Sequence, residues 1–411
     1  MKKRVLCIDH EGGYGGSSRS LFYLIQNIIQ IDSNIIFEVW CKKRGPIQEM
    51  YKRIGVQCRV KEDIRIYSTL YRFSRNFYGF FLTFFSLVKN KKFIFSSTDI
   101  INNNYDLVHF NHVNLYLFAL ALKIKTKIPF TFHIRTSLEN LYEGNIESSL
   151  AKKINQFTSY CLAKMQILII LKITKGLVFI SENEKQSFLN IIKNINNSVI
   201  AHNIFIKKKN IKKDKELDKL KKFKILALEN YSWSRGTDRL IEVAKEFKEM
   251  GKTNVIFIIA GNMALNSSQV KTLSLTKEKN NLEYLVKVND LQDYFKFLGP
   301  LKSPDAILAN SNILISLTRR VGPWGRSIIE AMSLGLPVLA TGNNKGFINK
   351  KNGIFIKNYN PRTIALEIIK LYTNKNRYRK MSKEAKNSIN SICNSKLNTK
   401  IVLKFWNNIL N

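Results

Sequence analysis

The residues best suited to chemistry lie in one stretch, 320–339, with the sequence RVGPWGRSIIEAMSLGLPVL. Its glycines and proline predict a loop, and the run that follows predicts a helix over 326–334 with Glu330 one turn inside it. The N–H groups at a helix N-terminus attract anions, and a carboxylate behind them can accept hydrogen bonds from sugar hydroxyls. The stretch therefore predicts a site for a phosphorylated ligand that is rich in hydroxyl groups.

A glycine-rich loop, EGGYGGSSRS over 11–20, follows the first apolar run of the chain. Gly15 and Gly16 precede a predicted helix that Ser17 or Ser18 is suited to cap, and glycines let a phosphate or a sugar approach the backbone amides closely. The loop matches neither the dinucleotide-binding glycine pattern nor the P-loop pattern. A plain turn between a strand and a helix is therefore the alternative interpretation.

A histidine closes another apolar run, FTFH over 130–133. Residues at the carboxyl end of a strand are the ones that contact ligands in parallel α/β sheets. His133 is therefore a candidate site residue, with the structural role of most lone histidines as the alternative.

The second half of the chain has further candidates at predicted strand ends. The segment ENYSWSRG over 229–236 follows an apolar run and carries Asn230 and Arg235. A guanidinium here can form paired hydrogen bonds with a diphosphate, and a solvated loop arginine is the alternative. The apolar run 255–260 leads directly to Gly261, at the expected edge of the site.

Short apolar runs that alternate with longer helical patterns must position these candidates. Such alternation is typical of βαβ units and parallel sheets. Helices are predicted at 17–30, 182–193, 238–250, 304–309, 326–334 and 361–372. Strands are predicted at 4–9, 35–41, 107–110, 130–133, 177–180, 199–201, 224–228, 255–260, 295–298, 313–316 and 337–340. The economical architecture is α/β, with two Rossmann-like doubly wound domains.

A highly charged segment that is poor in apolar residues predicts a linker over 207–222. It separates a first domain, 1–206, from a second domain, 223–390, and a C-terminal helix over 391–411 is expected to pack back towards the first domain. Ligands of doubly wound sheets bind beyond the carboxyl ends of the strands. Two such domains that face each other would place the site in the cleft between them.

The chain is strongly basic, with 67 Lys and Arg against 30 Asp and Glu in 411 residues and a formal net charge of +37. This balance favours an anionic partner, such as a nucleic acid, an anionic membrane surface or a phosphorylated substrate. Lysines that are merely solvated are the alternative. The five cysteines show no metal-ligand spacing and fit a reducing compartment. Since no apolar run reaches the roughly 18 residues of a spanning helix, we expect a cytoplasmic protein.

The segment 67–92 mixes aromatic and basic residues. As a helix it fits a membrane interface, with its basic groups on lipid phosphates, and it fits a core helix of the first domain equally well. The mixture also suits single-stranded nucleic acid. Because no RNA-binding module pattern appears, no specific nucleic-acid partner is expected.

Together these motifs resemble those of retaining GT-B-fold glycosyltransferases of family 4, the glycosyl transferases group 1 type. The matching segments come in the family's order and cover almost the whole chain: 11–20, 132–133, 178–182, Asn203, 235–236, 260–262, 297–301 and 323–332. The family's signature is a pair of glutamates separated by seven residues. Glu330 matches the second, which binds the ribose of the nucleotide, whereas Gly322 stands where the first usually contacts donor-sugar hydroxyls. Arg235 takes the place of the family's diphosphate-binding lysine, and Asn230 lies about where its arginine is expected.

The resemblance implies the GT-B fold and the transfer of a sugar from a nucleotide-diphosphate sugar to an acceptor hydroxyl, with retention of configuration and without a metal ion. It implies no cofactor apart from this donor substrate. The catalytic residues would be His133, Arg235 and Glu330. The loop facing the acceptor and the diphosphate would comprise Gly15, Gly16 and Ser17. The donor site would comprise Asn230, Gly261, Arg319, Gly322, Pro323, Trp324, Gly325, Arg326 and Glu330.

Family habit and the basic charge together indicate a glycan or lipid-linked acceptor of lipopolysaccharide, capsule or exopolysaccharide assembly. The protein would then bind peripherally to the anionic inner face of the membrane. A noncatalytic GT-B subunit that binds a nucleotide sugar or a glycan is the alternative, and Gly322 supports it. A nucleotide-sugar epimerase of the same fold has no motif of its own in this sequence.

Overall fold

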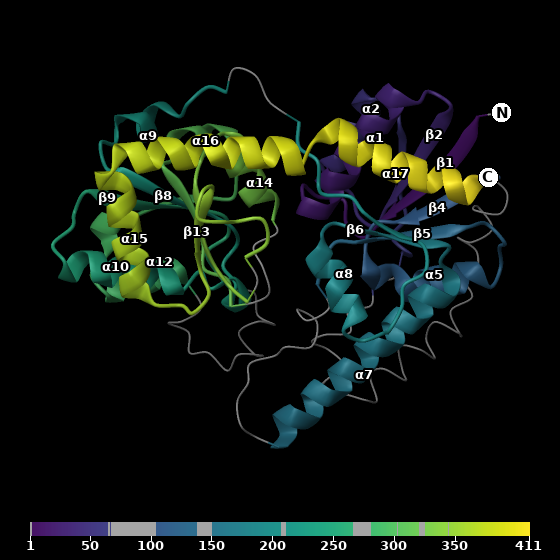
Figure 1. The fold of residues 1–411 in the computed structure, drawn as a ribbon, viewed down its shortest axis with the longest axis horizontal. Coiled ribbons are helices and arrows are strands. Elements are labelled where there is room, and N and C mark those ends of the chain that lie inside the picture. Colours follow the sequence, from purple (N-terminus) through teal and green to yellow (C-terminus); the bar gives the residue numbers. More distant parts are fainter. Residues whose placement is uncertain are drawn as a thin grey trace. The chain divides into compact units, whose positions relative to one another are not determined.

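A computed structural model describes residues 2–64, 66, 104–137, 150–206, 211–265, 281–301, 303–319, 325–343 and 345–411. The chain forms two units: Met1–Ile206 together with Asn394–Asn411, and Lys207–Cys393 (Figure 1). The aromatic and basic segment 67–92, for which a membrane-facing and a core role are both predicted, lies outside the described residues.

The first unit is built on a seven-stranded parallel sheet with the strand order β3-β2-β1-β4-β5-β6-β7. Between β1 and β4 the order reverses direction, and such a switch point is where doubly wound sheets open to ligands. The strands are β1 (Lys3–Asp9), β2 (Ile35–Cys41), β3 (Gln57–Val60), β4 (Leu107–Phe110), β5 (Phe130–Ile134), β6 (Gly176–Phe179) and β7 (Ser198–Ile200).

Helices cover both faces of this sheet. One face packs against α1 (Gly16–Ile31), α2 (Ile47–Arg53) and α17 (Ser395–Leu410), and the other against α5 (Tyr116–Lys123), α7 (Leu150–Ile173) and α8 (Glu182–Leu189). Because strand side chains alternate between the faces, Phe132 of β5 enters the core beneath α5 and α7, whereas His133 lies on the α1 and α17 side.

The helix α17 belongs to the first unit although it follows the second unit along the chain. Its Trp406 is fully buried, and the indole ring lies 5.0 Å from the ring of His109 on β4. Asn398 of the same helix accepts a hydrogen bond from the backbone N–H of His202 at 2.8 Å. The last helix therefore completes the core on the α1 face of the sheet.

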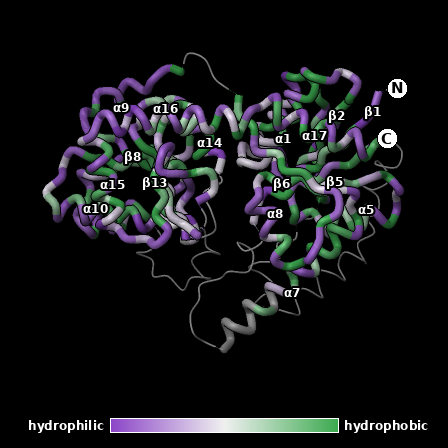
Figure 2. The backbone as a smooth tube through the Cα atoms, viewed as in Figure 1, coloured by the Kyte–Doolittle hydropathy of each residue, from purple (hydrophilic) through white to green (hydrophobic). Residues whose placement is uncertain are grey.

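The second unit is built on a six-stranded parallel sheet with the order β10-β9-β8-β11-β12-β13, and its switch point lies between β8 and β11. Figure 2 shows the strands as largely hydrophobic and the outer helices α9 and α16 as largely hydrophilic. The strands are β8 (Phe223–Leu228), β9 (Val255–Ala260), β10 (Phe295–Gly299), β11 (Ile313–Ser316), β12 (Val338–Thr341) and β13 (Gly353–Ile356).

The helices of the second unit bury one apolar stripe each against this sheet. In α10, for example, Val243, Ala244 and Phe247 are fully buried, at the spacing expected for one helix face. The helices are α9 (Lys215–Lys219), α10 (Arg239–Glu249), α12 (Leu282–Val288), α13 (Asp305–Asn310), α14 (Arg326–Ser333), α15 (Pro361–Thr373) and α16 (Lys375–Ile392).

The charged stretch 207–222, which the sequence predicts as a linker, packs on the second unit from residue 211 onward. Asp214 caps α9 through its side chain, and its backbone N–H donates to Asn310 Oδ1 at 2.6 Å. Leu217 is buried beneath α9. The buried Leu217, the Asp214 cap and the hydrogen bonds of Asn310 to Asp214 and Asp218 together hold this otherwise charged helix in place.

The predicted fold class of two doubly wound parallel α/β domains is confirmed. Every strand predicted from an apolar run is present, with ends that shift by at most one residue. The strands β3 and β13 were not predicted, and both lie at sheet edges. Within the described ranges, no helix combines the length and the apolar character needed to span a membrane.

Candidate functional site

Polar side chains from four strand ends meet at the carboxyl edge of the first sheet. Asp9 is the last residue of β1, Asn111 directly follows β4, and Asn203 follows β7. Arg135 lies immediately after β5 and connects this group. Because all the strands are parallel, their carboxyl ends lie at one edge, where ligands of this architecture bind.

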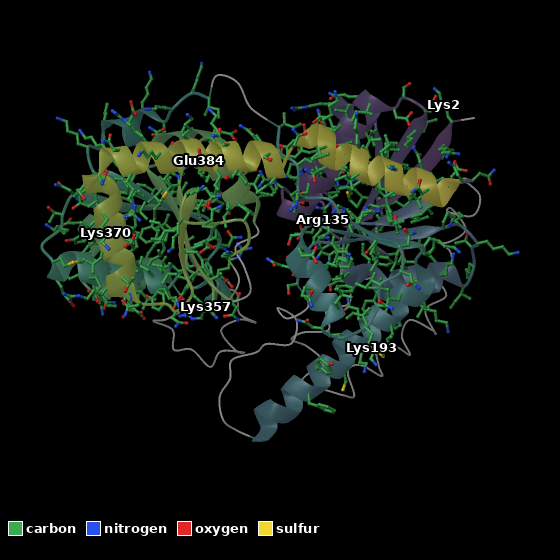
Figure 3. The ribbon with its side chains drawn as sticks, in the orientation of Figure 1. Lys2, Arg135, Lys193, Lys357, Lys370 and Glu384 are labelled. Atoms are coloured by element: carbon green, nitrogen blue, oxygen red, sulfur yellow. The ribbon has the colours of Figure 1, made fainter. Side chains whose placement is uncertain are left out.

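The guanidinium of Arg135 (labelled in Figure 3) makes hydrogen bonds with the side chains of Asn111, Asn203 and His133, among the residues that the structure describes. Its Nε donates to Asn111 Oδ1 at 2.7 Å, and its Nη1 donates to Asn203 Oδ1 at 2.7 Å. Its Nη2 lies 3.1 Å from His133 Nδ1. The planar fork of one arginine thus connects the ends of β4, β5 and β7.

The network continues from Asn111 to the switch point. Asn111 Nδ2 donates to Asp9 Oδ1 and to the backbone carbonyl of Ser17, both at 3.2 Å. Burial alone would raise the pKa of Asp9, but the hydrogen bond and charge of His10 and the hydrogen bond from Asn111 lower it below its ordinary value. Asp9 is therefore ionised and balances part of the charge of Arg135.

The structure places the predicted residue His133 inside this network. The side chain is buried, and its pKa is held well below 6.5 by burial first and then by the charges of Arg135 and His109. Its Nε2 atom is buried and has no hydrogen-bond partner among the described residues. The ring lines a small cavity of about 10 Å³ together with Ser20, Leu24, Arg135, Ala201, His202, Asn203, Ile204, Asn398 and Val402.

The glycine-rich loop begins α1 beside this network. Gly15 is the N-cap residue, and no side chain caps the helix, so the expected cap by Ser17 or Ser18 is wrong. A Cβ atom at Gly15 would lie 2.1 Å from Oε2 of Glu11, which is the end of a flexible side chain, so a larger residue here would require only a shift of that carboxylate. Gly16 and Ser17 form the first turn of α1, with their N-terminal amides at the switch point.

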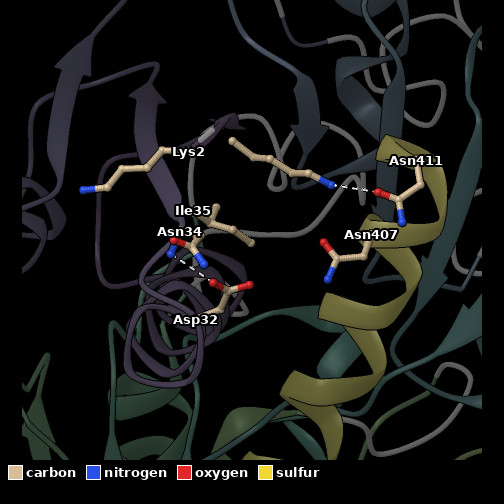
Figure 4. Close-up of a pocket in the computed structure, with 7 residues that line it drawn as sticks. Lys2, Asp32, Asn34, Ile35, Asn407 and Asn411 are labelled. Carbon is tan, nitrogen blue, oxygen red and sulfur yellow. Dashed lines mark hydrogen bonds between the residues drawn. The ribbon is translucent and has the colours of Figure 1, made fainter.

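A larger hollow of the first unit lies at the opposite, amino end of its strands. It measures about 520 Å³ and is open, and Lys3 Nζ donates to Asn411 Oδ1 across it at 3.1 Å (Figure 4). Its other lining residues are Lys2, Asp32, Asn34, Ile35 and Asn407. None of the predicted site residues lies there, and the amino edge of a parallel sheet is not where such folds bind ligands.

In the second unit, Arg235 lies at the switch point after β8, in the short 3-10 helix η2 (Trp233–Arg235). Its side chain is 59% exposed, and Nη1 lies 3.8 Å from Oε2 of the buried Glu229. Burial raises the pKa of Glu229 to about 7, although Arg235 and a hydrogen bond from Thr237 act in the other direction. Sequence reasoning missed Glu229, whose only signal is an acid directly after an apolar strand.

The loops around Arg235 are fixed by close backbone contacts. Asn230 Oδ1 accepts a hydrogen bond from the Asn262 backbone at 2.9 Å. Gly261 has a φ of +145°, and a Cβ atom there would lie 2.3 Å from the Glu229 carbonyl oxygen. The structure therefore brings Asn230, Arg235 and Gly261 into neighbouring loops, and their role in binding a donor stays a prediction.

Arg319 reaches the same edge from the end of β11, but its guanidinium binds a protein carboxylate. Its Nη1 and Nη2 donate to the two carboxylate oxygens of Asp238, both at 2.6 Å, and its backbone N–H donates to the Ser234 carbonyl at 3.0 Å. A bidentate pair of this kind balances the charge of the arginine. Arg319 therefore braces the η2 loop, which distinguishes it from the exposed Arg235.

Glu330 lies on α14, which begins after the N-cap residue Gly325 without any side-chain cap. Its Oε1 accepts a hydrogen bond from Nε of the buried Arg326 at 3.2 Å, four residues away on the same helix. Both predicted side chains are thus paired at the uncapped start of this helix. The other predicted residues of this loop, Gly322, Pro323 and Trp324, lie outside the described residues.

Comparison with known proteins places this arrangement in a family context. Residues 208–388 match the model of the family described as "Glycosyl transferases group 1". An uncharacterized glycosyltransferase of Methanocaldococcus jannaschii is 26% identical over 274 residues, which cover 65% of this chain and 66% of that protein. The match therefore spans just under two thirds of the relative's length.

Solved structures resemble the whole chain. The Anabaena protein HepE, in complex with UDP and glucose, has a TM-score of 0.74 at 14% identity and covers 99% of this chain and 100% of its own. Sucrose-phosphate synthase from Thermosynechococcus elongatus has a TM-score of 0.67 at 12% identity, with 99% of both chains covered. The lipopolysaccharide outer core galactosyltransferase WaaB has a TM-score of 0.61 at 13% identity, with 98% of both chains covered.

At these identities the likenesses establish the architecture, which is that of GT-B glycosyltransferases. The family match covers the unit that holds Arg235, Arg326 and Glu330. The chain therefore has the GT-B fold, and its second unit carries the sequence pattern of the glycosyl transferases group 1 family.

Proposed function

We propose that the protein is a glycosyltransferase that moves a sugar from a nucleotide-diphosphate sugar to an acceptor hydroxyl. The observation that carries the proposal is the family match over 208–388, with Glu330 held by Arg326 in the first turns of an uncapped helix. A carboxylate in that position can accept hydrogen bonds from the ribose hydroxyls, and the N-terminus of a helix favours phosphate.

Arg235 has the exposure and charge to neutralise the diphosphate leaving group as the bond to the sugar breaks. Removal of one preorganised electrostatic contact of this kind typically raises a reaction barrier by about 3–4 kcal/mol. In the first unit, His133 would position the donor sugar or the acceptor. Retention of configuration and independence from a metal ion are part of the proposal and rest on the resemblance to family 4.

Uridine diphosphate sugars are the donors to test first, since the similar HepE structures hold UDP with glucose and UDP-glucose. A glycan or lipid-linked acceptor in bacterial surface polysaccharide assembly is proposed from the net charge of +37 and the likeness to WaaB. The protein would act at the inner face of the membrane. Flotation with anionic vesicles at low salt tests that location, and failure to float would contradict it.

A noncatalytic subunit that binds a nucleotide sugar is the second candidate, and Gly322 favours it because glycine offers no carboxylate to the donor-sugar hydroxyls. A hydrolysis assay over a panel of nucleotide sugars separates the two functions. The enzyme is expected to release nucleoside diphosphate slowly from one donor, whereas a binding subunit would bind the donor and leave it intact.

A further inference from the structure

The chemistry of Arg135 determines the protonation of His133. A guanidinium can only donate hydrogen bonds and stays charged in proteins. Its Nη2 lies 3.1 Å from His133 Nδ1, so Nδ1 must be the acceptor of this bond. A neutral imidazole that accepts at Nδ1 carries its proton on Nε2.

Resting on the proposed function, we propose that Arg135 is a positioning residue, which holds His133 in the Nε2–H form so that the ring donates a hydrogen bond to an oxygen of the substrate. The state of the His133 Nε2 atom supports this role of Arg135. The atom is buried and without a partner among the described residues, and a buried donor that stays unpaired destabilises the protein. An oxygen of a sugar hydroxyl or a phosphate would satisfy it.

The surroundings of Arg135 favour a single orientation of the guanidinium. Two further bonds of 2.7 Å, to Asn111 and Asn203, anchor its Nε and Nη1, so that Nη2 faces the imidazole. The protonated imidazolium is disfavoured, because burial and the adjacent guanidinium both lower the pKa of His133. Arg135 thus selects one of the three protonation states of the ring.

His202 provides an internal control, because a different partner fixes its tautomer. Its Nδ1 lies 2.8 Å from the carbonyl oxygen of Ile180, and since a carbonyl only accepts, His202 carries a proton on Nδ1. Burial lowers the pKa of His202, which keeps the ring neutral. His133 and His202 should therefore show opposite tautomers in one spectrum.

The test is a long-range proton–nitrogen NMR spectrum of the full chain with nitrogen-15 histidine, which contains five histidines. The loss of signals in His133→Gln assigns His133. In the wild type we expect an unprotonated Nδ1 and a protonated Nε2 for His133, and the reverse for His202. Arg135→Met should shift His133 towards a mixture of both tautomers, whereas Arg135→Lys, which keeps a donor-only group, should restore the wild-type pattern.

The value of kcat distinguishes a positioning role of Arg135 from a role that only supports the fold. With the donor identified by hydrolysis, Arg135→Met is expected to lower kcat about tenfold, the loss of one hydrogen bond in the transition state. Affinity for UDP should stay within about twofold, because the proposed nucleotide-binding residues lie in the second unit. A mere folding defect would alter the His202 signals and UDP affinity as well.

Two results would overturn the inference: a proton on His133 Nδ1 in the wild type, or an unchanged Nε2–H tautomer in Arg135→Met. If Arg135→Met fails to fold, Arg135→Gln replaces it, because an amide can present either a donor or an acceptor and so permits both tautomers. The spectrum requires no substrate. Absence of nucleotide-sugar binding would therefore remove the proposed function without changing the tautomer result.

Discussion

At the scale of single residues, Arg235 and Glu229 form an unequal pair. The arginine is largely exposed, whereas the carboxylate 3.8 Å away is buried at the end of β8. Arg235 can therefore turn its charge towards a ligand, whereas Glu229 has little freedom to follow. By contrast, the neighbouring Arg319 is held by two bonds of 2.6 Å to Asp238.

Arg235→Ala is expected to weaken the binding of UDP at least about tenfold, because a hydrogen bond to a charged group contributes about 1.5–3 kcal/mol. Arg235→Lys keeps the charge without the planar fork and should fall between Ala and the wild type. Titration calorimetry measures the three affinities. Arg379→Ala, which removes an exposed arginine of α16, is the control. Equal UDP affinity in wild type and Arg235→Ala would remove Arg235 from the diphosphate site.

Glu229→Gln is expected to change how stability depends on pH. The folded protein holds the Glu229 proton up to a pKa of about 7, against an ordinary 4.5, so the folded state binds more protons than the unfolded state between these values. The free energy of unfolding of the wild type therefore falls as pH rises through this window, by about 3 kcal/mol from this group. Glu229→Gln does not lose this free energy of unfolding, so it should be more stable than the wild type above pH 7.

Urea unfolding at a series of pH values measures this difference. The buried Glu184 of the first unit also has a pKa raised to about 7 by burial, so the wild type and the variant share its contribution. Glu283→Gln, at an exposed position of α12, should reproduce the wild-type curve. Parallel curves for the wild type and Glu229→Gln would show that Glu229 ionises normally in the folded protein.

At the scale of elements, the loops after β8 and β11 pack closely against each other. Gly236 has a φ of +69°, and a Cβ atom there would lie 2.0 Å from the Leu317 carbonyl oxygen. Arg239 Nη1 donates to the same carbonyl at 3.1 Å. The η2 loop that carries Arg235 is therefore positioned by the end of the neighbouring strand.

The free energies of unfolding of Gly236→Ala and Gly251→Ala, when compared, measure the effect of this close contact. Gly251 has a similar φ of +63°, but a Cβ atom there would meet nothing within 4 Å. Both variants incur the left-handed backbone cost of roughly 1–2 kcal/mol, and Gly236→Ala should lose about a further 1–3 kcal/mol through overpacking. Urea unfolding reads out the difference. Equal losses of unfolding free energy in the two variants would mean that the η2 loop shifts to accommodate the Cβ atom at position 236 without strain.

The sequence predicted most strands from their apolar runs and missed β3 and β13, two edge strands of four residues each. Buried strands such as β9 are apolar on both faces, so their runs stand out. By contrast, β3 reads QCRV and has no fully buried residue, so local pattern gives no signal for it. Its place depends on pairing with β2, which the sequence alone does not reveal.

The candidate site was predicted in part for a related reason. His133, Arg235 and Glu330 were found because the first lies at the end of a predicted strand, the second in the loop after one, and the third in the first turns of a predicted helix. The network around Arg135 was missed because its bonds join residues far apart in sequence, such as Asn111 and Asp9. A polar residue directly after each apolar strand was the available signal, and only the sheet order shows that these residues meet.

At the scale of the whole molecule, each unit contributes its own set of groups at the switch point of its sheet or close to it. The first unit provides His133, Arg135 and the start of α1, and the second provides Arg235 and the start of α14. A net charge of +37 favours the approach of an anionic donor to either set. We propose that this donor is a nucleotide-diphosphate sugar whose nucleotide requires Glu330 for binding.

Calorimetric titration of UDP and a panel of nucleotide sugars tests this claim most directly, with wild type, Glu330→Ala and the control Glu283→Ala. We predict saturable binding to the wild type and the control, and binding about tenfold to a hundredfold weaker in Glu330→Ala, since hydrogen bonds to a carboxylate are lost. Circular dichroism verifies that each variant is folded. Absence of binding to every nucleotide sugar, or equal affinity in wild type and Glu330→Ala, would contradict the account.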